Sequence, residues 1–70
     1  MNQFKERLKE LRAERSLKQS EVARELNIQE PTYSSWEQGR REPNIDTILR
    51  LAEFFDVTVG QLLGSEDLYV

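Results

Sequence analysis

Apolar residues near the start of this 70-residue chain recur three or four positions apart, with charged residues between them. Phe4, Leu8 and Leu11 follow this spacing within residues 2–15. In an α-helix such positions lie on one face, whereas a half-buried strand would alternate apolar and polar residues. The pattern therefore predicts an amphipathic first helix at residues 2–15.

Residues that favour helix ends divide the rest of the chain. Asn27, Gly39 and Gly64 suit the left-handed conformation that stops a helix, and Asn44 and Thr58 are good N-caps. These signals predict four more short helices, at residues 19–26, 30–38, 45–55 and 59–63. We therefore expect an all-α fold of five helices.

A single domain at residues 1–64, followed by a tail at residues 65–70, is expected from this division. The fourth helix should bury one stripe of apolar residues, with Leu51 and Phe54 beside it; the stripe comprises Ile45, Ile48, Leu49, Ala52 and Phe55. The tail adds three apolar residues, Leu68, Tyr69 and Val70. Together with Leu51 and Phe54, these either complete the core or form a small self-association patch, and the sequence leaves both open.

The amino-acid composition excludes several kinds of covalent link, metal site and catalytic site. The chain contains no Cys and no His, which excludes disulfides, thiolate or imidazole metal sites, and catalytic triads built on either residue. It has no apolar run of the roughly 18 residues that a membrane span requires. We therefore expect a binding module rather than an enzyme, with no cofactor, no metal and no membrane partner.

Charge is unevenly distributed along the chain. Through Arg41 there are nine basic and seven acidic residues, a net charge of +2, whereas from Glu42 onward Arg50 faces six acids, a net charge of −5. The sum is −3, which argues against indiscriminate binding to nucleic acid. A local basic face on the N-terminal half is compatible with this distribution.

The stretch from Gln19 to Arg41 is the most informative. Two short helices joined by the three-residue turn Asn27–Gln29 form a helix-turn-helix pattern, whose second helix can enter the major groove of DNA. Tyr33 and Trp36 lie three residues apart and should face the core. The outward side of that helix is then made by Glu30, Pro31, Ser34 and Ser35, with Gln29 and Gln38 at its ends.

Several segments resemble the Cro/Xre helix-turn-helix family, which has the lambda-repressor-like fold. The resemblance rests on residues 17–23, Ile28, and residues 33–43, which read YSSWEQGRREP, and it continues through residues 48–52 and 56–63. It spans Phe4 to Gly64 without a gap. It implies a five-helix DNA-binding domain whose second and third helices form the helix-turn-helix.

The resemblance also implies roles for particular residues. Gln19 would donate to a backbone phosphate and brace the start of the third helix, and Arg12 would form a core salt bridge with Glu37. Positions that read bases or line the groove match Gln29, Glu30, Pro31, Ser34 and Ser35. Positions that hold the DNA backbone match Lys18, Gln19, Thr32, Gln38, Arg40 and Arg41.

The chain departs from the family pattern at four places. Lys18 and Gln29 are poor N-caps for the second and third helices, and Asn27 replaces the usual Gly. Glu30-Pro31 opens the third helix, where a carboxylate can accept from cytosine N4 but repels phosphates. This departure leaves two hypotheses: a selective site of modest affinity, or a face turned to another partner.

We therefore expect a sequence-specific DNA-binding regulator of transcription, namely a repressor that inserts the helix at residues 30–38 into the major groove. It should bind double-stranded DNA at a palindromic operator as a homodimer, because a single reading helix recognises too few base pairs. We expect the protein in the bacterial cytoplasm, associated with the nucleoid. Its gene can belong to the bacterium or to a phage. The alternative is a protein-interaction module of the same fold, such as an antitoxin or anti-regulator.

Overall fold

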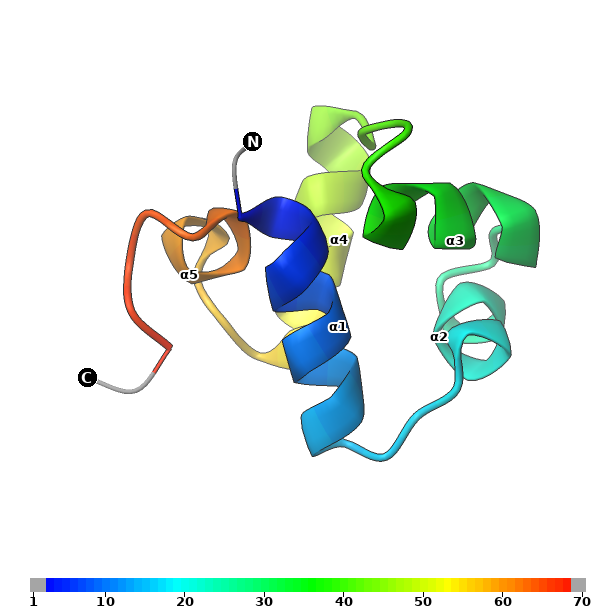
Figure 1. The fold of residues 1–70 in the computed structure, drawn as a ribbon, viewed down its shortest axis with the longest axis horizontal. Coiled ribbons are helices and arrows are strands. Elements are labelled where there is room, and N and C mark those ends of the chain that lie inside the picture. The colour runs from blue at the N-terminus through cyan, green and yellow to red at the C-terminus, as the bar shows by residue number, and fades with distance from the viewer. Residues whose placement is uncertain (1–2, 69–70) are drawn as a thin grey trace.

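Five α-helices and short connections make up the computed structural model, which describes residues 3–68 (Figure 1). The helices are α1 (Phe4–Glu14), α2 (Gln19–Glu25), α3 (Glu30–Gln38), α4 (Ile45–Phe55) and α5 (Val59–Leu63). No strand occurs among the described residues. The predicted all-α fold is confirmed, and the helix bounds agree with the sequence prediction to within two residues. None of the described helices is both long and apolar enough to cross a membrane.

The helix ends follow the local chemistry that the sequence predicts. Asn27 adopts a left-handed conformation with φ 57° after α2, and Gly39 does the same after α3 with φ 78°. The Asn44 side chain accepts the Thr47 backbone N–H at 2.9 Å, which satisfies one of the free donors at the start of α4. Thr58 caps α5 in the same way, accepting from the Gln61 N–H at 2.9 Å.

Like α1, helices α2 and α3 begin without a side-chain cap, and for α2 and α3 the sequence predicts this. Lys18 precedes α2 and has no acceptor to offer, but its own backbone N–H donates to the Glu21 carboxylate at 2.7 Å. Gln29 precedes α3, and its side chain makes no capping bond. Pro31 compensates in part, because it has no N–H to leave unbonded in the first turn.

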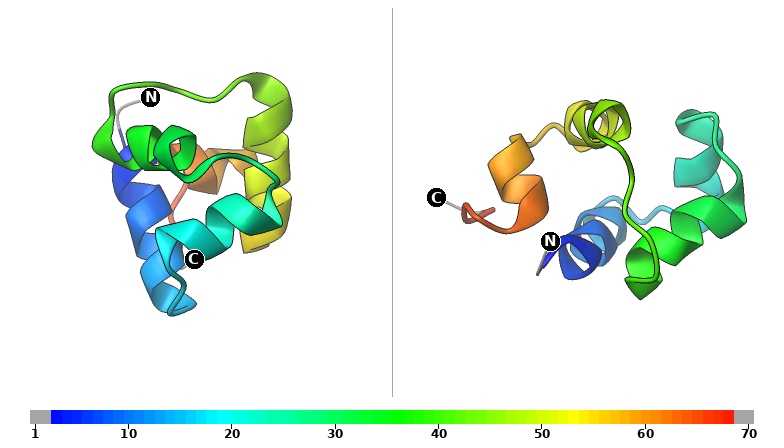
Figure 2. Two further views of the ribbon diagram at one scale, coloured as in Figure 1. Left: turned by 90° about the vertical axis from the view of Figure 1, so that its right-hand side faces the viewer. Right: turned by 90° about the horizontal axis from the view of Figure 1, so that it is seen from above.

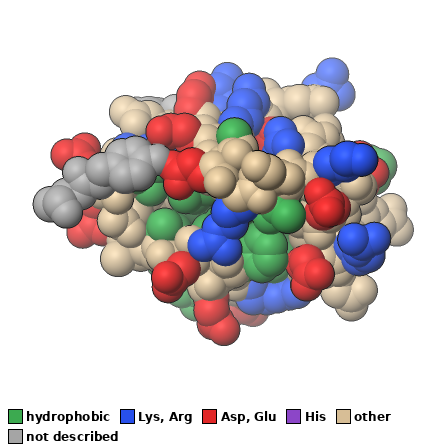
Figure 3. All heavy atoms as spheres, turned by 90° about the horizontal axis from the view of Figure 1, so that it is seen from below, with side chains coloured by type: hydrophobic (Ala, Val, Ile, Leu, Met, Phe, Trp, Pro, Cys, Tyr) green, Lys and Arg blue, Asp and Glu red, His purple; other side chains and the backbone are tan. Residues whose placement is uncertain are grey.

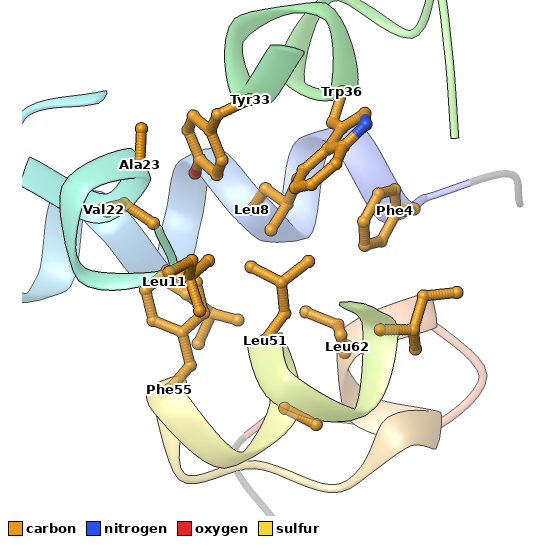
Figure 4. Packing of buried hydrophobic residues seen from close by; sticks show 13 residues of the cluster. Phe4, Leu8, Leu11, Val22, Ala23, Tyr33, Trp36, Leu51, Phe55 and Leu62 are labelled. Carbon is orange, nitrogen blue, oxygen red and sulfur yellow. The ribbon is translucent and has the colours of Figure 1, made fainter. Parts of the chain in front are cut away.

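The hydrophobic core lies where the five helices meet (Figure 4). Tyr33 and Trp36 point from α3 towards Leu8 of α1 and Leu51 of α4. Tyr33, Leu8 and Leu51 are completely buried, and Trp36 is nearly so. The thirteen buried hydrophobic residues are Phe4, Leu8, Leu11, Val22, Ala23, Leu26, Tyr33, Trp36, Ile48, Leu51, Ala52, Phe55 and Leu62.

The predicted core stripe of α4 is wrong at two positions. Ile45 is 75% exposed and Leu49 is 53% exposed, whereas Leu51 is completely buried and Phe54 half-buried. The buried stripe is therefore rotated around the helix and contains Ile48, Leu51, Ala52 and Phe55. Seven of the eleven residues of α4 are apolar, so periodicity alone did not determine which of them face the core.

The segment after α5 turns back onto the domain. The Ser65 backbone N–H donates to Gly60 O at 2.9 Å, and the Arg7 guanidinium of α1 donates to Glu66 O at 3.0 Å. Leu68 is half-buried and packs against the core, so it helps to complete the core of a single chain. Tyr69 and Val70, the other two apolar residues of the predicted tail, lie outside the described residues.

Candidate nucleic-acid interface

The α2–turn–α3 unit forms one end of the molecule. In the left view of Figure 2, α2 and α3 lie in front of the other helices, with α3 crossing above α2. The turn between them is fixed by the left-handed Asn27 and by the Ile28 N–H, which donates to Ala23 O at 2.9 Å. Ile28 is half-buried against the core, so the turn is anchored from within.

The two rings of α3 face inward, as predicted. Tyr33 and Trp36 contact each other edge to face, with ring centroids 5.8 Å apart and an interplanar angle of 69°. Glu37, one position further, is also buried. The other residues form what we call the outer face of α3. Its members are Gln29, Glu30, Pro31, Thr32 and Gln38, which are exposed, and Ser34 and Ser35, which are half-buried.

A buried carboxylate joins α3 to α1 and α2. Arg12 of α1 donates twice to Glu37, from Nε to Oε2 at 2.7 Å and from Nη2 to Oε1 at 3.0 Å, so the predicted salt bridge is confirmed and is bidentate. Tyr33 Oη donates to Oε2 at 2.5 Å, and Gln19 Nε2 of α2 donates to Oε1 at 3.0 Å. We refer to Arg12, Gln19, Tyr33 and Glu37 as the Glu37 cluster.

The electrostatics of the Glu37 cluster favour its charged pair. Burial by itself raises the pKa of Glu37, but the hydrogen bonds from Arg12, Tyr33 and Gln19 lower it further than burial raises it, so the net pKa lies below the usual value of 4.5. The hydrogen bond to Glu37 raises the pKa of Arg12. Burial, and then the hydrogen bond to Glu37, raises the pKa of Tyr33, which therefore stays a neutral donor.

Gln19 braces α3 at a different place from the one expected. Its amide donates to Glu37 in the last turn of α3, whereas the resemblance implies a brace at the first turn. One amide hydrogen is used in this bond, and the amide nitrogen carries a second that can serve as a donor. The half-buried side chain lies at the start of α2, and its predicted phosphate contact remains a prediction.

Hydrogen bonds also order the outer face of α3. Ser35 Oγ donates to the Thr32 carbonyl oxygen at 2.6 Å, and Gln38 Nε2 donates to Ser34 Oγ at 3.2 Å. A shallow pocket of about 230 Å³ opens here, lined by Pro31, Thr32, Ser35 and Arg41. The structure thus brings together residues predicted to read bases and residues predicted to hold phosphates.

The basic residues of this region gather at the end of α3. Arg40 and Arg41 are exposed, and both backbone N–H groups point to Ser35 O, at 3.0 and 3.4 Å. Lys5 of α1 lies against Gly39, where a Cβ would come within 3.0 Å of Lys5 Cδ. The nearness of Lys5 to this loop depends on how α1 packs against α3, which the hydrophobic pattern does not report. Elsewhere the charges are mixed: the face in Figure 3 carries acidic and basic side chains side by side.

Comparison with known proteins agrees with this geometry. Residues 8–62 match a family described as helix-turn-helix. The chain belongs to this family. A solved structure, that of a transcriptional regulator from Listeria innocua, superimposes with a TM-score of 0.84 at 35% identity, covering 89% of this chain and 58% of that one. The resemblance to Cro/Xre-type proteins is thereby confirmed.

Two curated relatives illustrate how this helix-turn-helix domain is used elsewhere. The transcriptional activator BcrR of Enterococcus faecalis is 35% identical over 66 residues, which are 94% of this chain and 32% of that protein. The phage CTXphi transcriptional repressor RstR of Vibrio cholerae is 33% identical over 64 residues, which are 91% of this chain and 58% of that protein. The chain therefore spans only one third to three fifths of these relatives.

Proposed function

We propose that this chain is a sequence-specific DNA-binding domain that regulates transcription, with α3 as the helix that enters the major groove. The observation that carries the proposal is the orientation of α3: its two rings are buried, its small polar outer face is open, and α2 and α3 together form one end of the molecule. A helix held in this way is able to bring its N-terminal residues to base edges. Both curated relatives above are named as regulators of transcription.

The outer face of α3 divides into residues for bases and residues for the backbone. We assign base reading to Gln29, Glu30, Pro31, Ser34 and Ser35, which begin α3 or occupy its middle turn. Phosphate contacts are assigned to residues around the edge of this surface: Lys18, Gln19, Thr32, Gln38, Arg40 and Arg41. Lys5 is added to this set because it packs against Gly39, next to Arg40. Backbone contacts fix the position of the protein, whereas base contacts carry the sequence information.

A homodimer on a palindromic operator is part of the proposal. One reading helix recognises only a few base pairs, which is too short a site among roughly 10⁶ or more competing sequences. Two copies on one face of the duplex would place their half-sites about 34 Å apart. Occupying such a site in the cytoplasm of a bacterium would exclude other proteins from the DNA, so we propose repression as the main outcome.

A protein-interaction module of the same fold is the second candidate, and Glu30 is the observation that favours it. This exposed carboxylate lies on the outer face of α3, where it would repel phosphates. Nuclease treatment during a pull-down from cell extract separates the two functions. A protein partner is retained after nuclease, whereas a complex that depends on DNA is lost.

The direct test is selection from random DNA duplexes at two salt concentrations. We expect a palindrome to be enriched, with affinity that falls steeply as salt rises. Arg41→Ala should weaken binding to every sequence alike, because a phosphate contact carries no sequence information. Asp67→Asn is the control, since the segment after α5 lies at the opposite end of the molecule from α3 (Figure 1). Failure of the folded protein to bind any duplex at low salt would exclude the proposed function.

A further inference from the structure

The proposed recognition helix, α3, carries no positively charged residue. Between Asn27 and Gly39 the only charged residues are Glu30 and Glu37, and Glu37 is buried in its cluster. The commonest base-specific contact in DNA complexes is an Arg or Lys that donates to guanine O6 and N7. Neither residue type is present on α3, so guanine edges have no cationic donor there.

Internal hydrogen bonds remove further donors from the outer face of α3. A serine hydroxyl has one hydrogen to donate, and Ser35 gives it to the Thr32 carbonyl oxygen at 2.6 Å. What Ser35 offers outward is therefore its acceptor lone pairs. Gln38 donates one amide hydrogen to Ser34 Oγ. Glu30 is acceptor-only when ionised, and Pro31 has neither a side-chain donor nor a backbone N–H.

Base edges in the major groove differ in what they need from such a surface. Guanine presents two acceptors, whereas cytosine N4 and adenine N6 are exocyclic amines that donate. Adenine sets the acceptor N7 beside its amine, and N7 repels the second oxygen of a carboxylate. Cytosine has a C–H at that side, so it suits Glu30 better. The thymine methyl group is a suitable partner for Pro31.

We infer that Glu30 is a specificity-determining residue that accepts a hydrogen bond from a cytosine N4 amine in each half-site and disfavours guanine at that position. This inference rests on the proposed function and names the kind of sequence that it selects. The same carboxylate repels the flanking phosphates, so it weakens binding to all other sequences as well. Selectivity is therefore obtained by penalising wrong sites more than by strengthening the right one.

The first test compares the sequences selected by the wild type with those selected by Glu30→Gln and Glu30→Ala. We expect one position of the half-site to be cytosine for the wild type and to lose that preference in both variants. Both variants should also bind unrelated duplexes several-fold more tightly, because a negative charge has left the groove. Asp67→Asn removes one negative charge far from α3 and should keep the cytosine preference. Circular dichroism establishes that each variant is folded.

The second test changes the DNA, so its main comparison is made with the wild-type protein alone. In the selected duplex, the cytosine at the Glu30-sensitive position is replaced by pyrimidin-2-one, which lacks the N4 amine. We expect about tenfold weaker binding by the wild type and by Asp67→Asn, the size of a good base contact. Glu30→Ala should bind the two duplexes equally.

The outcomes separate the inference from the function on which it rests. Failure of the folded wild type to enrich any duplex removes both. An enriched palindrome with guanine at the sensitive position, or with no position that responds to Glu30, overturns the inference and leaves DNA binding in place. Equal losses on pyrimidin-2-one for the wild type and Glu30→Ala also overturn it, because the amine would then act through another group.

Discussion

Glu37 is the residue on which the position of α3 depends. Its carboxylate is 2% exposed and receives hydrogen bonds from residues of α1, α2 and α3. A buried charge is costly unless it is paired and hydrogen-bonded, and here two oxygens receive four donors from Arg12, Gln19 and Tyr33. No buried polar side-chain atom among the described residues lacks a partner.

Removing Arg12 should therefore cost more stability than neutralising Glu37. Arg12→Met leaves an uncompensated buried carboxylate, and we expect the free energy of unfolding at pH 7 to fall by about 3–5 kcal/mol. Glu37→Gln keeps the shape and removes the charge, and we expect a loss of about 1–3 kcal/mol. Urea unfolding measures both. Equal stability of the three proteins would contradict the role assigned to this cluster.

The same pair predicts how stability depends on pH. The pKa of Glu37 is below 4.5 in the folded protein, so its contribution is fully present above about pH 4.5 and is lost as pH falls through the lower, folded pKa. In Arg12→Met the strongest of the bonds that lower this pKa is gone, and Glu37 takes up a proton at higher pH. Thermal melts between pH 3 and pH 7 should therefore show the gap between Arg12→Met and the wild type shrinking at acid pH. A gap independent of pH would exclude this explanation.

At the scale of the helices, the residues at helix ends predict the helix boundaries, but they do not predict which face of α4 is buried. Asn44, Thr58, Asn27 and Gly39 mark helix ends through the backbone groups they cap or the φ they adopt, and these effects are local. Which face of α4 is buried depends instead on how α4 packs against α1 and α5. Because apolar residues lie around most of α4, hydrophobic periodicity does not distinguish Leu49 from Leu51.

Substitutions on α4 should separate these two leucines. Leu51→Ala opens a cavity in the core and should lower the free energy of unfolding by about 2–5 kcal/mol. Leu49→Ala changes a side chain that is 53% exposed and should cost less than about 0.5 kcal/mol in a single chain. Denaturant unfolding at low protein concentration is the appropriate measurement. A large loss for Leu49→Ala would mean that this surface is covered in solution.

The candidate site was predictable to different degrees. The inward rings of α3 follow from a spacing of three residues, and the structure confirms them. The pairing of Arg12 with Glu37 came from the family resemblance, since residues 25 positions apart carry no local signal of contact. The contacts of Gln19 with the last turn of α3 and of Lys5 with Gly39 depend on packing between helices, which no periodicity reports.

At the scale of the whole molecule, the chain is acidic, but the proposed DNA-binding end has its own small set of cations. Four basic side chains are assigned to phosphates: Lys5, Lys18, Arg40 and Arg41. The other proposed backbone contacts, from Gln19, Thr32 and Gln38, are neutral and displace no counterions. The dependence of binding on salt should therefore reflect four charges for each chain and not the net charge of −3.

This count predicts a measurable slope. Each neutralised phosphate contributes about 0.9 to the decrease of log K with log salt, so we expect a slope of about −3.6 for each bound chain and about −7 for two chains on one operator. Fluorescence anisotropy over a series of salt concentrations measures it. Lys5→Ala should make the slope shallower by about 0.9 for each chain, whereas an unchanged slope would remove Lys5 from the interface.

The Glu37 cluster has one more consequence, which concerns the entropy of binding. Because α1, α2 and α3 share the Glu37 carboxylate, the orientation of α3 is set before any partner binds. Association then has only peripheral side chains to immobilise, at a cost of about 0.5–1.5 kcal/mol for each rotamer-rich group. The proposed DNA-binding surface is thus preorganised before it binds its partner.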